Sequence, residues 1–401
     1  MTRIVVVGGG PVGCVFALAA SRAIAGAEIV LVERNEPPVA DQAQTQAPGP
    51  QFDHRVYALS PQSISLLSEI GVWQRMSTDR LTPIDAMHVS GDADTPAKTL
   101  PRIDFSHGAP LAHIVEHKTL MAALYDALAE TGVKTIFGTT VTSMSIHGAQ
   151  HALALADRTQ AIGEMLQVDL VVAADGRQSR IRELAGIEID AKDYASVGIV
   201  ANFACERSHG NVARQWFTPD GVLAYLPLPH NEISIVWSVT RLFAESLPAF
   251  GDPAFAMAVA NAGHLALGNL TATSPVEAIP LKRVTARQSV KPGLALVGDA
   301  AHAIHPLAGQ GVNLGFGDVR SLIEVIRNRP TMAGVGDMAT LRRYARAQSG
   351  ATAAMGETTD CLHTLFSSND NVAKWVRRTG FEWFNRSGLV KRLVTDYVVR
   401  T

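Results

Sequence analysis

The fold of this chain is decided by the stretch Val5-Val6-Val7-Gly8-Gly9-Gly10-Pro11-Val12-Gly13 near its start. Residues 2–7 are typical of a buried strand, and an apolar helix is predicted from Pro11 to about Ala25. Glycines at this spacing allow a tight turn and let a pyrophosphate approach the backbone at the helix N-terminus. A second strand is predicted at residues 28–33. The sequence therefore begins with a βαβ unit of the kind that binds a dinucleotide.

The acid at the end of the second strand narrows the choice of nucleotide. Glu33 follows Gly13 by 20 residues, the position at which a carboxylate hydrogen-bonds a ribose hydroxyl. A carboxylate there disfavours a 2′-phosphate, so the unit should hold FAD or NAD rather than NADP. The alternative is a glycine-rich turn without a ligand, but the strand, the helix and the spaced acid together argue against it.

A second glycine-rich stretch lies far along the chain, at Gly298-Asp299-Ala300-Ala301-His302. The apolar residues 294–297 precede it, and Gly309-Gln310-Gly311 follows it and opens another predicted helix. Asp299 is placed to accept a hydrogen bond from a ribityl hydroxyl. The amides of residues 309–311 could stabilise negative charge on a reduced flavin ring. Two distant segments are therefore predicted to bind one flavin.

Three other motifs carry weaker predictions. Asp175-Gly176 follows the predicted strand 168–174; an ordinary turn is an equally good interpretation, although a cation such as Arg182 could lock this loop. Arg55 lies between an irregular loop, residues 37–53, and a helix predicted from Ser60, so it faces a phosphate or a flavin edge, or it is simply solvated. His302 and His305 have no third ligand at a sensible spacing, so we predict that they stabilise their loop and bind no metal.

The composition bounds the class of protein. The chain has 401 residues, 47% of them apolar and 18% charged, and a formal net charge of −2. These values predict packed domains and exclude a strongly basic protein, so nucleic acid is not an expected partner. Three scattered cysteines match neither a zinc site nor a disulfide framework, and we expect a reducing cytoplasm. The first strand leaves no room for a signal peptide, and no apolar run reaches the roughly 18 residues of a membrane span.

The predicted elements divide the chain into interleaved units of the α/β class. We expect a discontinuous, Rossmann-like FAD-binding domain at residues 1–80, 112–190 and 285–340. A mainly antiparallel substrate-binding sheet is expected at residues 81–111 and 191–284. Residues 341–401 should be helical, and they carry aromatic and basic side chains. Such a region covers its own core or touches an anionic membrane surface.

Taken together, the motifs resemble the FAD-dependent aromatic hydroxylases related to para-hydroxybenzoate hydroxylase. Within that group the chain looks most like the hydroxylases of ubiquinone biosynthesis, over most of its length. Besides the glycine-rich segments, the likeness rests on Phe52-Asp53-His54-Arg55-Val56-Tyr57-Ala58-Leu59-Ser60, Trp216-Phe217-Thr218-Pro219-Asp220-Gly221, Leu226-Pro227-Leu228-Pro229 and Ser234-Ile235-Val236-Trp237.

The resemblance implies which residues hold and activate FAD. Those expected beside the reacting part of the flavin, and so named as catalytic, are Arg55, Pro306, Gly309, Gln310 and Gly311. The residues expected to contact the cofactor are these five together with Gly8, Gly10, Pro11, Val12, Gly13, Glu33, Arg34, Lys118, Asp175, Asp299, Val312 and Asn313. Of these, Val312 and Asn313 would line the flavin ring with residues 306–311. Where relatives often carry Arg, this chain has Lys118 after Val115-Glu116-His117, which keeps the charge but loses the bidentate fork.

The resemblance also implies the chemistry. A reductant would reduce FAD, dioxygen would add at the flavin C4a to give a hydroperoxide, and one oxygen would pass to a phenolic ring. The expected substrate is a polyprenylated precursor of ubiquinone. Because the chain has no second dinucleotide fingerprint, NAD(P)H would bind transiently, or a protein would donate the electrons.

Three questions stay open at the level of sequence. The substrate could instead be a small phenol or a secondary metabolite, or the protein could be a non-catalytic FAD-binding member of a biosynthetic complex. Peripheral contact with the inner membrane face or with such a complex is also possible in this scheme. No catalytic base stands out, because candidates such as Arg214, Tyr225 and His230 cannot be told from ordinary surface or core residues.

Overall fold

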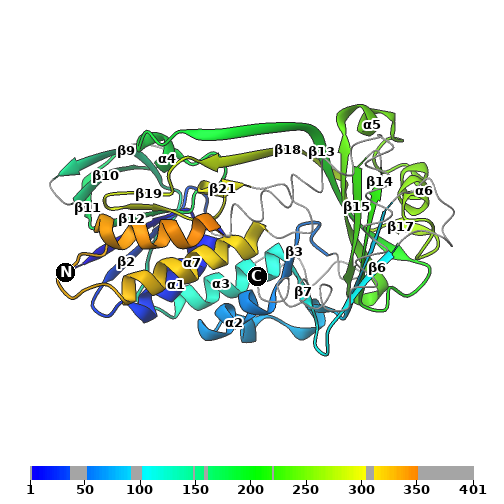
Figure 1. Cartoon of the computed structure of the whole chain (residues 1–401), viewed down its shortest axis with the longest axis horizontal. Helices are drawn as coiled ribbons and strands as arrows, with labels where there is room; N and C mark the ends of the chain where they lie inside the picture. Colours follow the sequence, from blue (N-terminus) through cyan, green and yellow to red (C-terminus); the bar gives the residue numbers. More distant parts are fainter. Residues whose placement is uncertain are drawn as a thin grey trace.

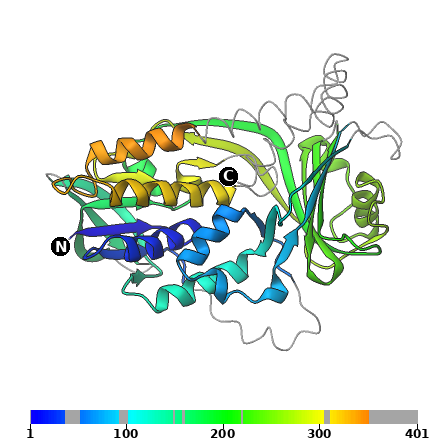
Figure 2. The ribbon, with the colours of Figure 1, turned by 60° about the horizontal axis from the view of Figure 1, so that its bottom comes forward.

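The computed structural model describes residues 2–36, 52–91, 102–147, 150–157, 161–218, 221–303 and 311–350. Two large sheets lie at opposite ends of the molecule, with a small sheet between them (Figure 1). The long strand β13 (Ile189–Cys205) and its partner β18 (Glu277–Ala286) run from one end to the other and join them (Figure 2).

The first large sheet has six strands in the order β19-β20-β12-β1-β2-β8. All neighbouring pairs are parallel except β19 and β20. Because both faces are covered, the central strands are continuous apolar runs rather than alternating ones. The strands are β1 (Arg3–Val7), β2 (Glu28–Val32), β8 (Lys134–Ile136), β12 (Leu170–Ala173), β19 (Val290–Lys291) and β20 (Leu294–Leu296).

Different layers cover the two faces of this sheet. Helices α1 (Pro11–Ala23), α3 (His117–Ala129) and α7 (Gly311–Arg327) pack on one face (Figure 1). An antiparallel sheet of β9 (Thr140–His147), β10 (Gln150–Ala156) and β11 (Ala161–Val168) packs on the other. This second covering layer was not expected from the sequence.

The second large sheet has nine strands, eight of them in the order β21-β18-β13-β16-β15-β14-β5-β6, and β17 pairs with β13. We call the face that packs against α5 (Arg241–Ser246) and α6 (Pro253–Ala262) the outer face. The opposite, inner face is turned toward the first sheet (Figure 1). The remaining strands are β5 (Ala86–Ser90), β6 (Arg102–Ser106), β14 (Val212–Thr218), β15 (Gly221–Leu228), β16 (Glu232–Thr240), β17 (Leu270–Ala272) and β21 (His302–Ala303).

A three-stranded sheet fills the space between the two large ones. It consists of β3 (Val56–Leu59), β7 (Ala112–Glu116) and β4 (Thr82–Ile84), and α2 (Pro61–Glu69) follows β3 directly. Its apolar side packs, together with Phe52, on Leu226 and Leu228 of the inner face. The short elements are η2 (Trp73–Arg75), η3 (Thr78–Arg80), α4 (Arg180–Leu184), η5 (Pro229–Asn231) and η6 (Gly298–Ala300).

The α/β class predicted from the sequence is confirmed. The helices expected after Gly10, Ser60 and Gly311 are present, and the antiparallel strands expected within residues 191–284 form the second sheet. The proposed domain boundaries remain a prediction. Residues 338–350 are helical, whereas residues 351–401, with most of the predicted aromatic and basic region, lie outside the described residues. Within the described ranges, no helix is long and apolar enough to cross a membrane.

Candidate FAD site

The glycine turn between β1 and α1 is shaped by close backbone packing on one side and open space on the other. A Cβ atom on Gly13 would lie 1.9 Å from the Gly8 carbonyl oxygen, so only glycine allows α1 to begin this close to the turn. Gly8 itself has a φ of +107°, with the Ala174 carbonyl oxygen 2.4 Å from the position of a Cβ. At Gly10 a Cβ would meet nothing within 4 Å. That open space lies at the N-terminus of α1, where a pyrophosphate would bind.

Glu33, at the end of β2, supports this turn. Its Oε2 accepts a hydrogen bond from the Gly9 amide at 2.5 Å, and its Oε1 accepts from the Asn35 amide at 2.9 Å. The carboxylate therefore stands beside the glycines that would hold the pyrophosphate, as a ribose-binding acid should. Arg34, the next residue, is exposed.

Asp175 stands at the end of β12, the strand next to β1. Its Oδ2 accepts a hydrogen bond from the Ile181 amide at 3.1 Å, while its Oδ1 is buried without a partner in the structure. A buried carboxylate oxygen without a donor is costly, so a ligand hydroxyl at this point would be stabilising. This orphan oxygen fits the polar chain of FAD.

Arg182 connects the Asp175 loop to the second glycine-rich stretch. Its guanidinium donates to the Arg177 carbonyl and to the Ala300 carbonyl, both at 2.8 Å. Arg182 is 7% exposed, so these bonds are made with little competition from water. The cation therefore locks the loop in place, as the sequence analysis suggested, and it also fixes η6 beside it.

The turn that carries Asp299 is stabilised by Asp318, a buried acid of α7. Asp318 Oδ2 accepts hydrogen bonds from the Gly298 amide and from His302 Nε2, both at 2.8 Å. Burial opposes a charge on His302, but Asp318 outweighs it and raises the pKa of His302. His302 is thus a loop-stabilising histidine, as predicted, whereas His305 lies outside the described residues.

The Asp299 side chain is exposed, yet the protein around it removes part of its hydration. Burial raises the pKa of Asp299. The positive charges of Arg177, His302 and Arg55 oppose that rise. A carboxylate in this setting gains from any hydroxyl donor that a ligand brings.

The two glycine-rich stretches, nearly 300 residues apart in sequence, touch through one side chain. A Cβ on Gly315 of α7 would lie 2.5 Å from Val12 Cγ2, and one on Gly298 would lie 3.2 Å from the same atom. Val12 therefore packs into the contact between α1, α7 and η6. Small residues at both positions bring the N-terminal ends of α1 and α7 to the same side of the sheet, so one extended ligand can reach both.

The first turn of α7 is tied to the small sheet. Asn313 Oδ1 accepts from the Ser60 amide at 3.1 Å and from Ser63 Oγ at 2.7 Å, and its Nδ2 donates to the Ala58 carbonyl at 2.8 Å. These bonds occupy the Asn313 side chain, so it positions the helix end rather than offering a free amide. Gly311 and Val312 begin α7 beside it. Pro306, Gly309 and Gln310 lie outside the described residues.

Arg55 brings a charge to the other edge of this site. The side chain is exposed and is close enough to Asp299, Tyr57 and His117 to influence the pKa of each. The Tyr57 hydroxyl lies 2.9 Å from His117 Nδ1. Burial raises the pKa of Tyr57 to about 12 and lowers that of His117. A neutral imidazole can accept a hydrogen bond from the tyrosine hydroxyl, and the pair forms a polar link beside Arg55.

The structure also places the three candidate bases. Tyr225 lies on the outer face, and its hydroxyl donates to the Val259 carbonyl of α6 at 2.7 Å. Arg214 pairs with Tyr225 across β14 and β15, so it shares that face. His230 is exposed in η5. Neither Tyr225 nor Arg214 points toward the cofactor site, and this excludes them as bases for a substrate bound on the inner face.

Comparison with known proteins identifies the family of this chain. The model of the FAD binding domain family matches residues 1–356. The chain is also 34% identical to the 3-demethoxyubiquinol 3-hydroxylase of Escherichia coli K12, over 99% of this chain and 98% of that protein. The chain belongs to the FAD-binding family.

Another sequence relative and a solved structure are also similar to this chain. The human ubiquinone biosynthesis monooxygenase COQ6 is 28% identical over 98% of this chain and 92% of its own length. The p-nitrophenol 4-monooxygenase PnpA of Pseudomonas putida DLL-E4 superposes with a TM-score of 0.75 at 16% identity, covering 100% of this chain and 98% of that one. At that identity PnpA shows the shared fold and no more. FAD is therefore the nucleotide that the 8–13 turn, Asp175 and Asp299 fit.

Several residues that organise the site were not predicted from the sequence. Asp318 supports the Asp299 turn and His117 contacts Tyr57, but neither was named as a site residue. Tyr57 was quoted only as part of the stretch 52–60 that carries the family resemblance. An acid inside the apolar pattern of α7 was the one available sign of Asp318, since an unpaired carboxylate is rarely buried in a helix.

Proposed function

We propose that this protein is an FAD-dependent monooxygenase that hydroxylates the phenolic ring of a polyprenylated intermediate of ubiquinone biosynthesis. The observation that carries the proposal is the end-to-end match, at 34% identity, to a ubiquinol-ring hydroxylase. A match over the full length of both chains includes the sheet that would hold the substrate, not only the cofactor-binding turns.

In this scheme each part of the site holds one part of FAD. The 8–13 turn and Glu33 hold the adenosine and pyrophosphate, and Arg34 lies at that end. Asp175 and Asp299 bind the polar chain, and Arg55, Lys118 and the start of α7, with Pro306 and residues 309–313, surround the ring. FAD, once reduced, supplies the activation of dioxygen, and the chain supplies binding, orientation and exclusion of water.

The inner face of the nine-stranded sheet offers a wall suited to an apolar substrate. Phe217, Val222 and Ala224 are buried there in adjacent strands, and the half-buried Val236 lies next to Ala224. Alternation along β14, β15 and β16 places these four on the face opposite Trp216 and Tyr225. The polar side chains of Gln215 and Ser238 lie beside them on the same face, but apolar side chains predominate there, and this favours an isoprenoid tail over a small, polar phenol.

We also propose NAD(P)H, bound transiently, or a protein electron donor as the reductant. The substrate's tail would keep it in a membrane, so we propose a cytoplasmic protein that meets the inner membrane face peripherally. The basic and aromatic residues of 341–401 are the part of the sequence suited to that contact.

The decisive test is the quinone content of a strain from which this protein has been deleted. We expect ubiquinone to fall and one under-hydroxylated, polyprenylated precursor to accumulate, with recovery on return of the wild-type protein. A strain carrying the Asp299→Ala variant should resemble the deletion. Normal ubiquinone with no accumulated precursor would contradict the proposal. The purified protein should show the visible absorption bands of oxidised flavin, at least after FAD is added.

A further inference from the structure

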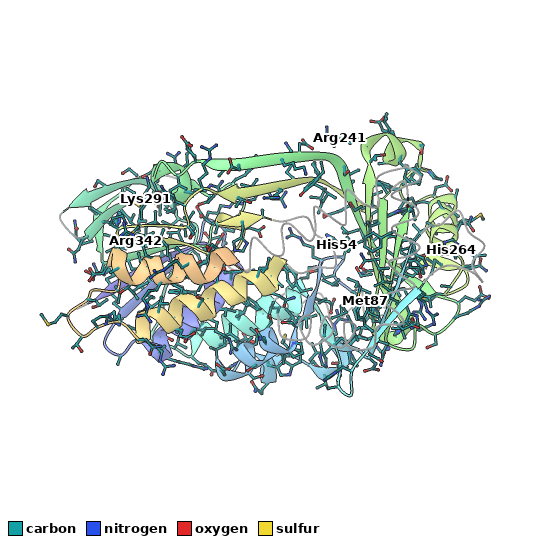
Figure 3. All side chains as sticks on the ribbon, viewed as in Figure 1. His54, Met87, Arg241, His264, Lys291 and Arg342 are labelled. Carbon is teal, nitrogen blue, oxygen red and sulfur yellow. The ribbon has the colours of Figure 1, made fainter. Side chains whose placement is uncertain are left out.

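A short segment, residues 52–55, lies between the two large sheets and carries Arg55. His54, at its middle, is seen between the sheets in Figure 3. On the substrate side, Asn202 of β13 donates both hydrogens of its amide to this segment. The bonds run from Nδ2 to the Phe52 carbonyl at 3.2 Å and to the Asp53 carbonyl at 3.1 Å. Asn202 is fully buried, so water does not compete for these bonds.

The FAD-binding side holds the same segment through its other polar groups. The Asp53 amide donates to Glu116 Oε1 at 2.6 Å. The Asp53 carboxylate accepts from the Arg55 amide at 3.1 Å and from the Lys118 amide at 3.2 Å. Residues 52–55 are therefore held from two sides: the Asn202 amide donates to the Phe52 and Asp53 carbonyls, and Asp53 bonds to Glu116 at the end of β7 and to Lys118 at the start of α3. The Arg55 backbone is fixed between these contacts.

The buried amide of Asn202 is poorly explained by stability of its own sheet. Among the residues that the structure describes, its Oδ1 has no partner, and neither has the Oγ of Ser234, the residue directly opposite on β16. An unpaired buried oxygen is destabilising, and a valine, as at position 200 on the same face, would avoid it. What Asn202 provides that an apolar residue cannot is the pair of bonds to residues 52 and 53.

We propose that Asn202 is a positioning residue, which sets Arg55 against the flavin and so couples the substrate sheet to the cofactor site. The coupling to substrate rests on the proposed function, whereas the effect on FAD does not. His54 makes a second and more accessible link to β18, with Nε2 3.1 Å from Glu277 Oε2. A shift of β13 or β18 on substrate binding is passed to Arg55 through these contacts.

The experiment is a double-mutant cycle on FAD affinity, measured by titrating the apoprotein. Asn202→Asp keeps the shape but turns a carboxylate oxygen toward two carbonyls, which repel it and push residues 52 and 53 away. We expect Asn202→Asp and Arg55→Ala each to weaken FAD binding by about ten-fold. Because Asn202 acts through Arg55, the double variant should bind FAD about as weakly as Arg55→Ala alone. Additive losses, or an unchanged affinity in Asn202→Asp, would overturn the proposal.

Two controls separate positioning from general damage. Tyr225→Phe removes a buried hydrogen bond on the outer face of the same sheet and should leave FAD affinity unchanged. If Asn202→Asp does not fold, Asn202→Leu removes the same two bonds without burying a charge. If circular dichroism shows that neither variant folds, Asn202 is a stability residue and the proposal fails. Since the titration needs only FAD, its result stands even if no polyprenylated phenol is hydroxylated.

A second measurement tests the coupling to substrate. In Asn202→Leu with saturating FAD, more of the reductant consumed should yield hydrogen peroxide and less should yield hydroxylated product than in wild type. An unchanged ratio of peroxide to product would show that Asn202 acts on FAD binding alone. If the wild-type protein forms no product with any polyprenylated phenol, the proposed function fails while the FAD cycle is unaffected.

Discussion

The two large sheets hold their functional residues in different ways. In the six-stranded parallel sheet, site residues stand in turns at the carboxyl ends of adjacent strands, as Gly8, Glu33 and Asp175 do. In the nine-stranded, mainly antiparallel sheet, the candidate substrate residues lie on one face, and the opposite face is ordinary core under α6. Substitutions in the first sheet should therefore alter FAD binding, and those in the second should alter substrate affinity or stability, depending on the face.

The largest effect on stability and FAD binding is expected at Gly13, in the tight turn between β1 and α1. Gly13→Ala places a methyl group 1.9 Å from a backbone oxygen, so we expect a loss of about 3 kcal/mol in the free energy of unfolding and no FAD binding. The matched variant is Gly10→Ala, whose methyl group meets no atom of the described residues within 4 Å. It should keep the wild-type stability in urea unfolding and still bind FAD at least ten-fold more weakly. Equal stabilities of the two variants would contradict this picture.

A smaller, pH-dependent effect on stability is expected for His302, which supports the turn that carries Asp299. The pKa of His302 is raised above its usual 6.5 by Asp318. Protonated His302 therefore stabilises the fold fully below pH 6.5, and this contribution is lost as pH rises through the raised pKa. His302→Gln keeps a donor but no charge, and it should cost about 2 kcal/mol at pH 6 and less at high pH. Urea unfolding across pH checks this; an equal loss at every pH would show that charge plays no part.

Substituting two valines of β16, one on each face, compares the two faces of the nine-stranded sheet. Val236→Thr puts a hydroxyl on the inner face at almost constant volume. It should raise KM for a polyprenylated phenol about five-fold, as expected for a cost of about 1 kcal/mol, with FAD affinity unchanged. Val239→Thr makes the same change on the buried outer face. It should lower the free energy of unfolding and leave KM as it was. If Val239→Thr alone raised KM, the assignment of the faces would be wrong.

The smallest effect is expected from the outer face. Tyr225→Phe removes the hydrogen bond to the Val259 carbonyl, an oxygen that also accepts from the Gly263 amide. Because that oxygen keeps a partner, the loss in the free energy of unfolding should be about 1 kcal/mol. Hydroxylation rate and its pH profile should not change. A changed pH profile would restore Tyr225 as a candidate base.

Much of the cofactor side could be predicted because its information is local. The family, the α/β class and the FAD-binding turns follow from glycines, acids and apolar runs at short spacing, and the family and fold class are confirmed. The β9-β10-β11 sheet was missed, because an alternating strand shows that a face is buried but not what buries it. The roles of the individual site residues remain predictions, and Pro306, Gly309 and Gln310 lie outside the described residues.

The substrate side could not be predicted, because its information is in pairings between distant strands. Whether Arg214 or Tyr225 faces a substrate depends on the register of β14 and β15, and one residue of slip would reverse it. Likewise, no local pattern connects Asn202 with residues 52 and 53, about 150 positions earlier.

By itself, the stretch from Val5 to Gly13, with Glu33 at the end of the next strand, predicted a dinucleotide site, because only glycine allows a backbone to pack and to approach a pyrophosphate as closely as this turn does. Only the tertiary structure decided which residues lie on the inner face of the second sheet, and that Asn202 contacts the segment that carries Arg55. Those positions depend on strand register and on packing between sheets, where each contact joins residues that the sequence keeps far apart.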